Sequence, residues 1–131
     1  MKSVKGYVFS RPFMGQRVPQ HVQNLVIRDY CKKQGIQYLL SATEYALADT
    51  YLILQQVLDD LSQLDGIVFY SLFLLPEQKL ERDRVTHIIL DNNKIIHFAV
   101  EGLRMSNKTE LERIEAIWQV KNVLPNCLSE I

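Results

Sequence analysis

Hydrophobic positions along the chain fall into short continuous runs separated by stretches with helical spacing. The run 6–9 (Gly-Tyr-Val-Phe) is rich in β-forming residues and predicts a buried strand. A loop held by Pro12 and Gly15 follows it. Pro19 suits the first turn of a helix, and Gly35 suits its C-terminal end. The apolar stripe of this helix is predicted at Val18, Val22, Leu25, Val26 and Tyr30.

The same alternation continues through the middle of the chain. Residues 36–40 predict a second strand, closed by a loop over residues 41–45. A second helix, capped by Asp49 or Thr50, ends at Asp65-Gly66. Its predicted stripe is Leu54, Val57, Leu58, Leu61 and Leu64.

The second half contains the most apolar run of the chain, residues 67–75, which is typical of a strand buried on both faces and stopped by Pro76. Residues 77–90 predict a partly exposed helix, and the turn 91–93 leads to a strand at 94–100. A last helix begins at a capping box, Thr109-x-x-Glu112. The apolar positions of these two helices are Leu80, Val85, Ile88 and Ile89 in the first, and Leu111, Ile114, Ile117 and Trp118 in the second.

Strands and helices therefore alternate along the whole chain, which predicts right-handed βαβ crossovers. The fold class is α/β: a three-layer sandwich around a mostly parallel sheet of four or five strands, resolvase-like or flavodoxin-like. The length of 131 residues and the apolar fraction of 47% are those of an ordinary globular domain, so we expect residues 1–131 to form one domain.

Charge and cysteine content narrow the functional classes. Lys+Arg and Asp+Glu are equal at 15 each, whereas nucleic-acid binders usually carry a basic excess, so we expect no nucleic-acid partner. Cys31 and Cys127 fit no metal or disulfide spacing, and neither GxGxxG nor a P-loop lysine occurs, so no metal and no cofactor is predicted. The N-terminus has no signal-peptide pattern and no apolar run could span a bilayer, which predicts a cytoplasmic location.

Polar side chains gather where the predicted strands end, and ligands of parallel sheets bind at the carboxyl ends of strands. Arg11 and Arg17 lie in a loop before a helix and could hold an anion there. The alternative is that both arginines are solvated or pair with Glu44 and Glu101. The other side chains expected to bind a ligand at this edge are Ser41, Thr43, Tyr45, Tyr70 and Ser71.

Four residues at the same edge are candidates for catalysis. Ser10 could act as a nucleophile if His21 served as its base. Glu44 and Glu101 are better candidates for proton transfer, since a carboxylate at a partly closed edge can have a raised pKa. Salt bridges to the arginines are the structural alternative. His97 is expected to be a hydrogen-bonded core residue and His87 an exposed one.

The order of elements resembles the catalytic domain of serine recombinases, from the strand at 6–8 to the helix that ends before 66–69. The resemblance implies a strand order of 2-1-3-4. The recombinase Arg-x-Ser pattern is absent, because Phe9 and Arg11 occupy those places with Ser10 between them. Residues 72–75 (Leu-Phe-Leu-Leu) replace the motif that follows the central strand. DNA strand exchange is therefore not expected.

The stretch 6–24 is similar to a second family, the sporadic carbohydrate cluster proteins of bacterial surface-carbohydrate gene clusters. Residues 28–31, 40–45 and 70–72 carry the same resemblance. It implies a role in making or modifying surface polysaccharide or lipopolysaccharide sugars, and it implies no particular reaction.

Two functions are compatible with these observations. The first is binding or modification of a sugar or nucleotide-sugar intermediate, with Arg11 and Arg17 on phosphate or carboxylate and with Glu44 or Glu101 moving a proton. The second is a non-catalytic interaction or regulatory domain, in which the last helix, bearing Leu111 and Trp118, forms a homo-oligomer contact.

Overall fold

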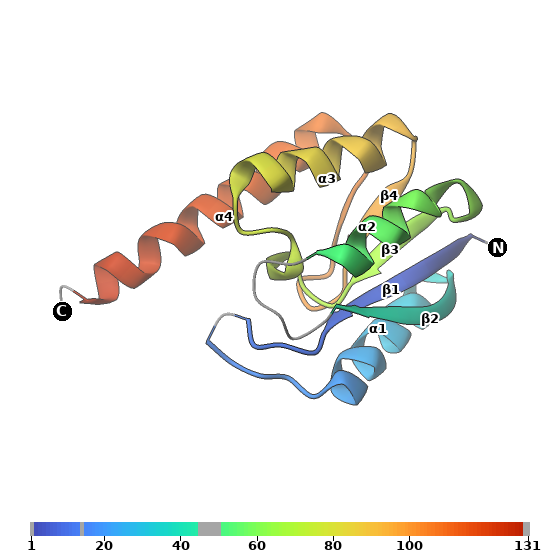
Figure 1. The fold of residues 1–131 in the computed structure, drawn as a ribbon, viewed down its shortest axis with the longest axis horizontal. Coiled ribbons are helices and arrows are strands. Elements are labelled where there is room, and N and C mark those ends of the chain that lie inside the picture. The colour runs from blue at the N-terminus through green and yellow to red at the C-terminus, as the bar shows by residue number, and fades with distance from the viewer. Residues whose placement is uncertain (1, 14, 45–50, 130–131) are drawn as a thin grey trace.

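Five strands form one sheet in the order β2-β1-β3-β4-β5 (Figure 1). The structure is a computed structural model, and it describes residues 2–13, 15–44 and 51–129, with side chains as far as Lys121. The first four strands are parallel and β5 is antiparallel. The predicted mostly parallel sheet and the order 2-1-3-4 are confirmed. The strands are β1 (Ser3–Phe9), β2 (Gln37–Glu44), β3 (Gly66–Phe69), β4 (Ile95–Phe98) and β5 (Leu103–Met105).

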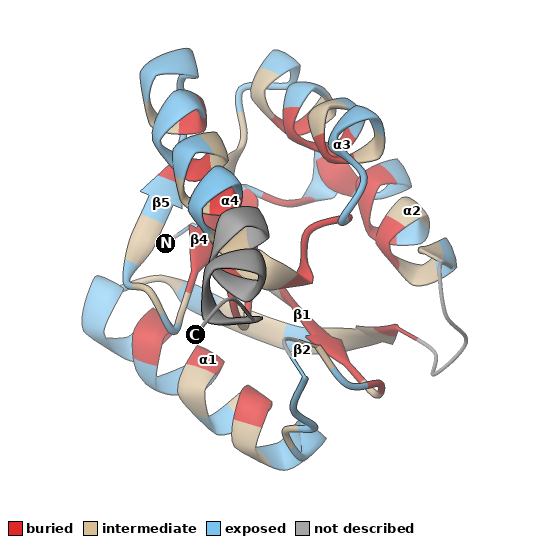
Figure 2. Ribbon diagram, turned by 90° about the vertical axis from the view of Figure 1, so that its left-hand side faces the viewer, coloured by how far each residue is buried: buried red, intermediate tan, exposed pale blue. Residues whose placement is uncertain are grey.

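The helices make the outer two layers. Helix α1 (Gln20–Gln34) covers one face of the sheet, and α2 (Leu52–Asp59), α3 (Lys79–Asp91) and α4 (Lys108–Ser129) cover the other (Figure 2). Each face of the sheet has its own hydrophobic core. Alternate residues of β1 belong to the two cores, because successive side chains of a strand point to opposite faces. Tyr7 and Phe9 pack under α2 to α4, and Val4 and Val8 pack under α1. The three-layer α/β fold class is confirmed.

Helix α1 buries a different face from the one predicted. Pro19 is its N-cap residue, and Gly35 ends it in the left-handed conformation with φ of 68°. Leu25 of the predicted stripe is 56% exposed, while the buried residues are Gln23, Ile27, Tyr30 and Cys31.

Gln23 explains the error in the stripe. Its side chain donates to the carbonyls of Phe9 (2.8 Å) and Val18 (2.9 Å) and accepts from the Phe9 amide (3.0 Å). A polar side chain can be fully buried when its hydrogen bonds are satisfied, and hydrophobic spacing alone does not reveal such a position.

Strand β2 is longer than predicted, since residues 41–44 belong to the strand and not to a loop. Ala42, Thr43 and Glu44 pair with Tyr7, Val8 and Phe9 after a shift in register. Gly6 lies at this shift: a Cβ there would clash with the Ser41 side chain and lie 3.0 Å from the Tyr38 ring, so a larger residue would force these side chains to move.

The apolar run 67–75 was predicted as one strand, but only its first part is one. Strand β3 ends at Phe69, and a 3₁₀ turn (η2, Leu72–Leu74) follows. Ser71 Oγ accepts from the Phe73 amide and begins that turn.

The predicted stripe of α2 is confirmed, because Leu54, Val57, Leu58, Leu61 and Leu64 are all buried. Asp49 and Thr50, its predicted caps, lie outside the described residues.

Helices α3 and α4 begin at residues other than those predicted. The cap of α4 is Asn107, whose Oδ1 accepts from the Glu110 amide at 2.9 Å, while Glu110 Oε1 accepts from the Ser106 amide. The N-cap of α4 therefore lies two residues before Thr109, the residue predicted for it. Leu80 of α3 is 82% exposed, and Arg82 takes a place in the core instead.

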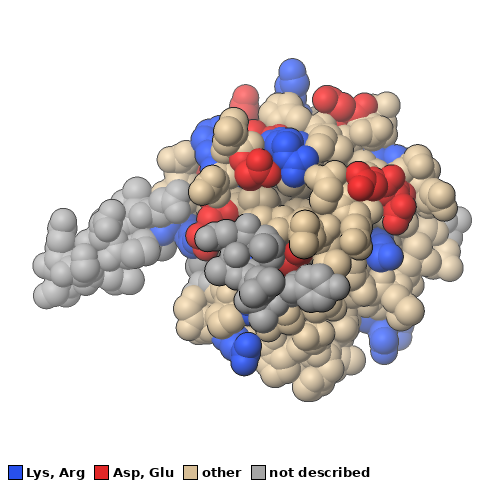
Figure 3. Space-filling view, viewed as in Figure 1, with Lys and Arg blue, Asp and Glu red and all other residues tan. Residues whose placement is uncertain are grey.

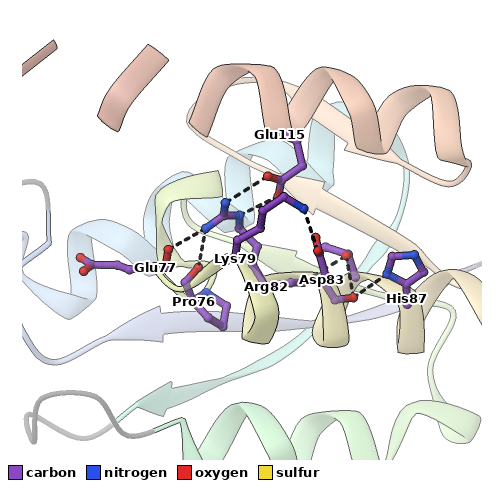
Figure 4. A network of polar contacts seen from close by, with 8 residues as sticks. Pro76, Glu77, Lys79, Arg82, Asp83, His87 and Glu115 are labelled. Carbon is purple, nitrogen blue, oxygen red and sulfur yellow. Dashed lines mark hydrogen bonds and ion pairs between the residues drawn. The ribbon is translucent and has the colours of Figure 1, made fainter. Parts of the chain in front are cut away.

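Arg82 fastens α3 to α4 (Figure 4). Its guanidinium forms two hydrogen bonds to Glu115, at 2.6 and 3.0 Å, and two more to the carbonyls of Pro76 and Glu77. It also lies 4.4 Å from the centre of the Trp118 ring. A buried cation is tolerated when a carboxylate and further acceptors satisfy it, as they do here.

The turn after α3 has the predicted left-handed asparagine, Asn93, with φ of 58°. Strand β5 was not predicted: Gly102, at φ of 64°, turns the chain so that residues 103–105 pair with β4.

The two histidines of the second half lie as predicted. His97 of β4 is buried and bonds to the Tyr30 hydroxyl, and His87 is exposed.

Candidate functional site

Ser10 lies directly after β1, at the carboxyl edge of the sheet. Its hydroxyl donates to the Glu44 carbonyl at 2.6 Å, and its amide donates to the same oxygen at 3.1 Å. Both groups thus hold the ends of β1 and β2 together. The hydroxyl proton is directed at a main-chain carbonyl, and His21 is exposed in the first turn of α1.

Glu44 is fully buried and caps helix α2. Its carboxylate accepts hydrogen bonds from the amides of Ile53 (3.1 Å) and Leu54 (3.0 Å) and from the Tyr7 hydroxyl (2.7 Å). A carboxylate at a helix N-terminus satisfies free amide groups and complements the helix dipole. These contacts give Glu44 a structural role.

Tyr7 remains a neutral donor to that carboxylate. Burial raises the pKa of Tyr7 strongly, the Glu44 carboxylate raises it further, and the nearby Arg11 acts in the opposite direction. Arg11 is 8% exposed, and its guanidinium lies 4.4 Å from the ring centre of Phe9 and 4.9 Å from that of Tyr51. The arginine is therefore enclosed between two aromatic rings, which favours it by cation–π attraction.

Glu101 makes a second cluster of the same kind at the ends of β3 and β4. Its carboxylate accepts from the Ser71 hydroxyl (2.7 Å) and from the Leu72 amide (2.9 Å), so it closes the turn η2. Tyr70 stands beside it, and burial and then the Glu101 charge raise the pKa of that phenol. Tyr70 also packs edge-on against Phe13, with ring centres 5.9 Å apart.

The remaining predicted residues do not join these two clusters. Arg17 is exposed and reaches the Ser10 carbonyl at 3.5 Å. Ser41 bonds to Tyr38 under α1 at 2.6 Å, and Thr43 donates to Gln20 at 3.5 Å. Tyr45 lies outside the described residues. The ion pairs formed by described residues join helix residues, and neither Arg11 nor Arg17 pairs with Glu44 or Glu101.

A groove of about 510 Å³ lies beside this edge, between the first turns of α2 and α3. Tyr51, which stacks on Arg11, forms part of its wall, so the groove adjoins the predicted location. None of the predicted site residues is in the described lining. The lining consists of Tyr51, Leu52, Gln55, Pro76, Glu77, Gln78, Glu81 and Arg84.

Arg84 connects the two sides of this groove, which we call the α2–α3 groove. Its Nη1 donates to Gln55 Oε1 at 3.0 Å across the groove, and its Nε donates to Glu81 Oε2 at 3.1 Å. Sequence reasoning missed these residues because the charged tract 77–84 is typical of any solvated helix face. The position of α2 opposite that tract is a tertiary feature without a local sequence signal.

Charges of both signs are interspersed on the face of the molecule that carries α2, α3 and α4 (Figure 3). Within residues 2–13, 15–44 and 51–129, no group of three or more His, Cys, Asp or Glu side chains is arranged to hold a metal ion. No helix in the described part of the chain has the length and apolar character needed to cross a membrane.

Comparisons with known proteins establish the fold and leave the function open. No family model matches the sequence, and no curated protein matches it. Among solved structures, the N-terminal catalytic domain of TP901-1 integrase, a serine recombinase, is similar, with a TM-score of 0.58 and 16% identity over 95% of this chain and 98% of that one. The predicted resolvase-like fold is confirmed. The resemblance to sporadic carbohydrate cluster proteins rests on the sequence stretches alone.

Proposed function

We propose that this domain binds a carbohydrate in the α2–α3 groove, in the service of making or modifying bacterial surface polysaccharide. The lining of the groove is the observation that carries the proposal. It combines the Tyr51 ring with two amides, two carboxylates and a guanidinium. Sugar hydroxyls both donate and accept hydrogen bonds, and sugar C–H faces pack on aromatic rings, so this mixture suits a sugar.

The charges of the groove favour the sugar part of a ligand over a diphosphate. Among the described lining residues, two carboxylates (Glu77 and Glu81) accompany one guanidinium, that of Arg84, which already bonds to Glu81 and Gln55. The N-terminus of α2, which could otherwise attract a phosphate, is occupied by the Glu44 carboxylate. We therefore propose a sugar without a phosphate as the ligand of this groove.

We propose binding rather than catalysis, because the polar groups at the sheet edge already form hydrogen bonds within the protein. Ser10 Oγ is a donor to the Glu44 carbonyl, and the carboxylates of Glu44 and Glu101 accept from backbone amides and hydroxyls. A proton-transfer role for either glutamate would require these bonds to break.

Amide NMR titration tests the proposal with neutral hexoses, N-acetylhexosamines, uronic acids and nucleotide sugars at constant ionic strength. We expect saturable shifts confined to residues 51–55 and 76–84. Arg84→Ala should weaken binding at least about tenfold, since a hydrogen bond to a charged group contributes about 1.5–3 kcal/mol. Arg113→Ala, an exposed arginine on α4, is the matched control and should bind normally.

A second pair of variants separates ligand contact from folding. Glu77 has an exposed side chain in the groove, and Glu112 is exposed on α4, so both tolerate alanine. Weaker sugar binding in Glu77→Ala, with Glu112→Ala unchanged, supports the groove. Shifts that fall outside 51–55 and 76–84, or no shift at millimolar sugar, would contradict it.

A second function, assembly of a homo-oligomer, is favoured by α4. This helix runs to Ser129 and extends beyond the rest of the fold (Figure 1). Leu111 and Trp118 are buried in the protein's own core, so we propose the exposed part of the helix around Val120, which is 58% exposed, as the contact. Light scattering tests it: Val120→Glu should dissociate an oligomer that the neighbouring exposed Gln119→Glu leaves intact, and a monomeric wild type would contradict it.

A further inference from the structure

A second, smaller hollow lies at the opposite edge of the sheet, on the face covered by α1. It has a volume of about 60 Å³ and is formed at the amino ends of the parallel strands. The last residue of α1 and strands β4 and β5 border it, together with the apolar side chains of Val4, Ile36 and Ile95. The polar side chains in its wall are Lys2, Gln34, Asp65, His97 and Arg104.

His97 lines this hollow, and one of its two ring nitrogens is engaged in a hydrogen bond. Its Nδ1 bonds to the Tyr30 hydroxyl at 2.7 Å. Burial raises the pKa of Tyr30, so that hydroxyl keeps its proton and can donate to Nδ1. The neutral imidazole then carries its hydrogen on Nε2. In the described part of the structure Nε2 has no hydrogen-bond partner, and His97 is 5% exposed.

Two cations accompany this donor. Neither the Lys2 ammonium nor the Arg104 guanidinium forms an ion pair or side-chain hydrogen bond with another described residue. Burial lowers the pKa of His97 to about 4, and the charges of Arg104 and Lys2 act in the same direction. The opposing charge is Asp65, whose Oδ2 accepts from the Ser3 amide at 2.7 Å.

We infer that this hollow binds a compact oxyanion of the phosphate or sulfate class, held by Lys2, Arg104 and the Nε2–H of His97. The hollow is lined by two positive charges and by a largely buried ring that carries an N–H donor, from three different strands or strand ends. The volume corresponds to about two water molecules at roughly 30 Å³ each, which excludes a large organic ligand and leaves room for one tetrahedral ion. The site is remote from the α2–α3 groove and does not depend on sugar binding.

Titration of the full chain with inorganic phosphate at pH 7, at constant ionic strength adjusted with NaCl, tests the inference. The readout is the ¹H–¹⁵N long-range spectrum of the histidine rings. We expect a saturable shift of the His97 Nε2 signal, while the rings of His21 and His87, both exposed, serve as internal controls and do not move. Sulfate should compete with phosphate. A phosphate monoester that competes more strongly than the free ion indicates an ester as the ligand, and one that fails to compete indicates the free ion.

Substitutions of the two cations that line the hollow test whether phosphate binds there. Arg104→Gln and Lys2→Gln change exposed residues, and each should weaken phosphate binding at least about tenfold. Arg113→Gln removes one exposed positive charge from α4 and should leave binding unchanged. A His97 signal that does not move overturns the inference. So does a shift that never saturates and is equal in Arg104→Gln and Arg113→Gln, which would mean an adventitious ion only.

Discussion

Three buried polar residues, Gln23, Glu44 and His97, hold different elements of this fold together. Each has a partner distant in sequence: Gln23 bonds to the end of β1, Glu44 to the start of α2, and His97 to Tyr30 of α1. Removing one partner of a buried hydrogen bond leaves the other unsatisfied, which costs about 1–3 kcal/mol. These residues are therefore expected to be sensitive to substitution although they lie outside the α2–α3 groove.

His97 predicts how stability depends on pH. Its pKa is lowered to about 4 in the folded state by burial and by Arg104 and Lys2, against about 6.5 in the unfolded chain. The unfolded state therefore binds a proton first as pH falls. The contribution of His97 is complete above pH 6.5 and is lost between pH 6.5 and 4, up to about 3 kcal/mol.

Urea denaturation between pH 7.5 and 4, in a buffer without phosphate or sulfate, measures this loss. The free energy of unfolding of His97→Gln should fall less steeply than that of the wild type in this range. His87→Gln removes an exposed histidine and should follow the wild type. Equal slopes for His97→Gln and the wild type would show that His97 titrates normally.

At the scale of elements, the contact between α3 and α4 depends on the Arg82–Glu115 pair. Arg82 is 2% exposed and its partner side chain 15%. Removal of one member of a buried pair strands the other charge, which costs about 3–5 kcal/mol, whereas replacement of both by apolar residues costs much less. We expect Glu115→Leu to be strongly destabilising and the double variant Arg82→Met with Glu115→Leu to recover part of the loss.

A double-mutant cycle by chemical denaturation checks this coupling. The exposed pair Asp29–Lys33 on α1 is the control, because surface pairs contribute about 0–1 kcal/mol. Additive effects of the two core substitutions would mean that Arg82 contributes through its carbonyl contacts and the Trp118 ring rather than through Glu115.

At the scale of the whole molecule, two cores share one sheet, and we expect them to unfold together. Trp118, the single tryptophan of the chain, reports on the core under α2 to α4, and Cys31 reports on the core under α1. The Cys31 thiol is buried, and burial raises its pKa to about 11, so it should be unreactive until that layer opens.

Tryptophan fluorescence and thiol labelling, measured in a Cys127→Ser background, should give coincident denaturation midpoints. Labelling of Cys31 at lower denaturant than the fluorescence change would mean that the α1 layer opens separately and that residues 1–131 are not one cooperative domain.

The sequence by itself determined the order of strands and helices, the α/β class and most of the buried stripes. Those features follow from local periodicity, which is a property of neighbouring residues. Only the tertiary structure decided the ends of β2 and β3, the added strand β5 and the buried places of Gln23 and Arg82. Each depends on partners elsewhere in the fold, as with Ser71 at the end of β3 against Glu101, and Arg82 against Glu115.

For the candidate site, too, the sequence determined one part and the tertiary structure another. The sequence predicted the carboxyl edge of the sheet as its location, because parallel strands place their following loops together. The tertiary structure decided that Glu44, Glu101 and Ser10 bond to the backbone at that edge, and that the α2–α3 groove beside it is lined by Gln55, Gln78 and Arg84. Hydrogen-bond partners and the packing of one helix against another are set by distance in space, and no local pattern in the chain records them.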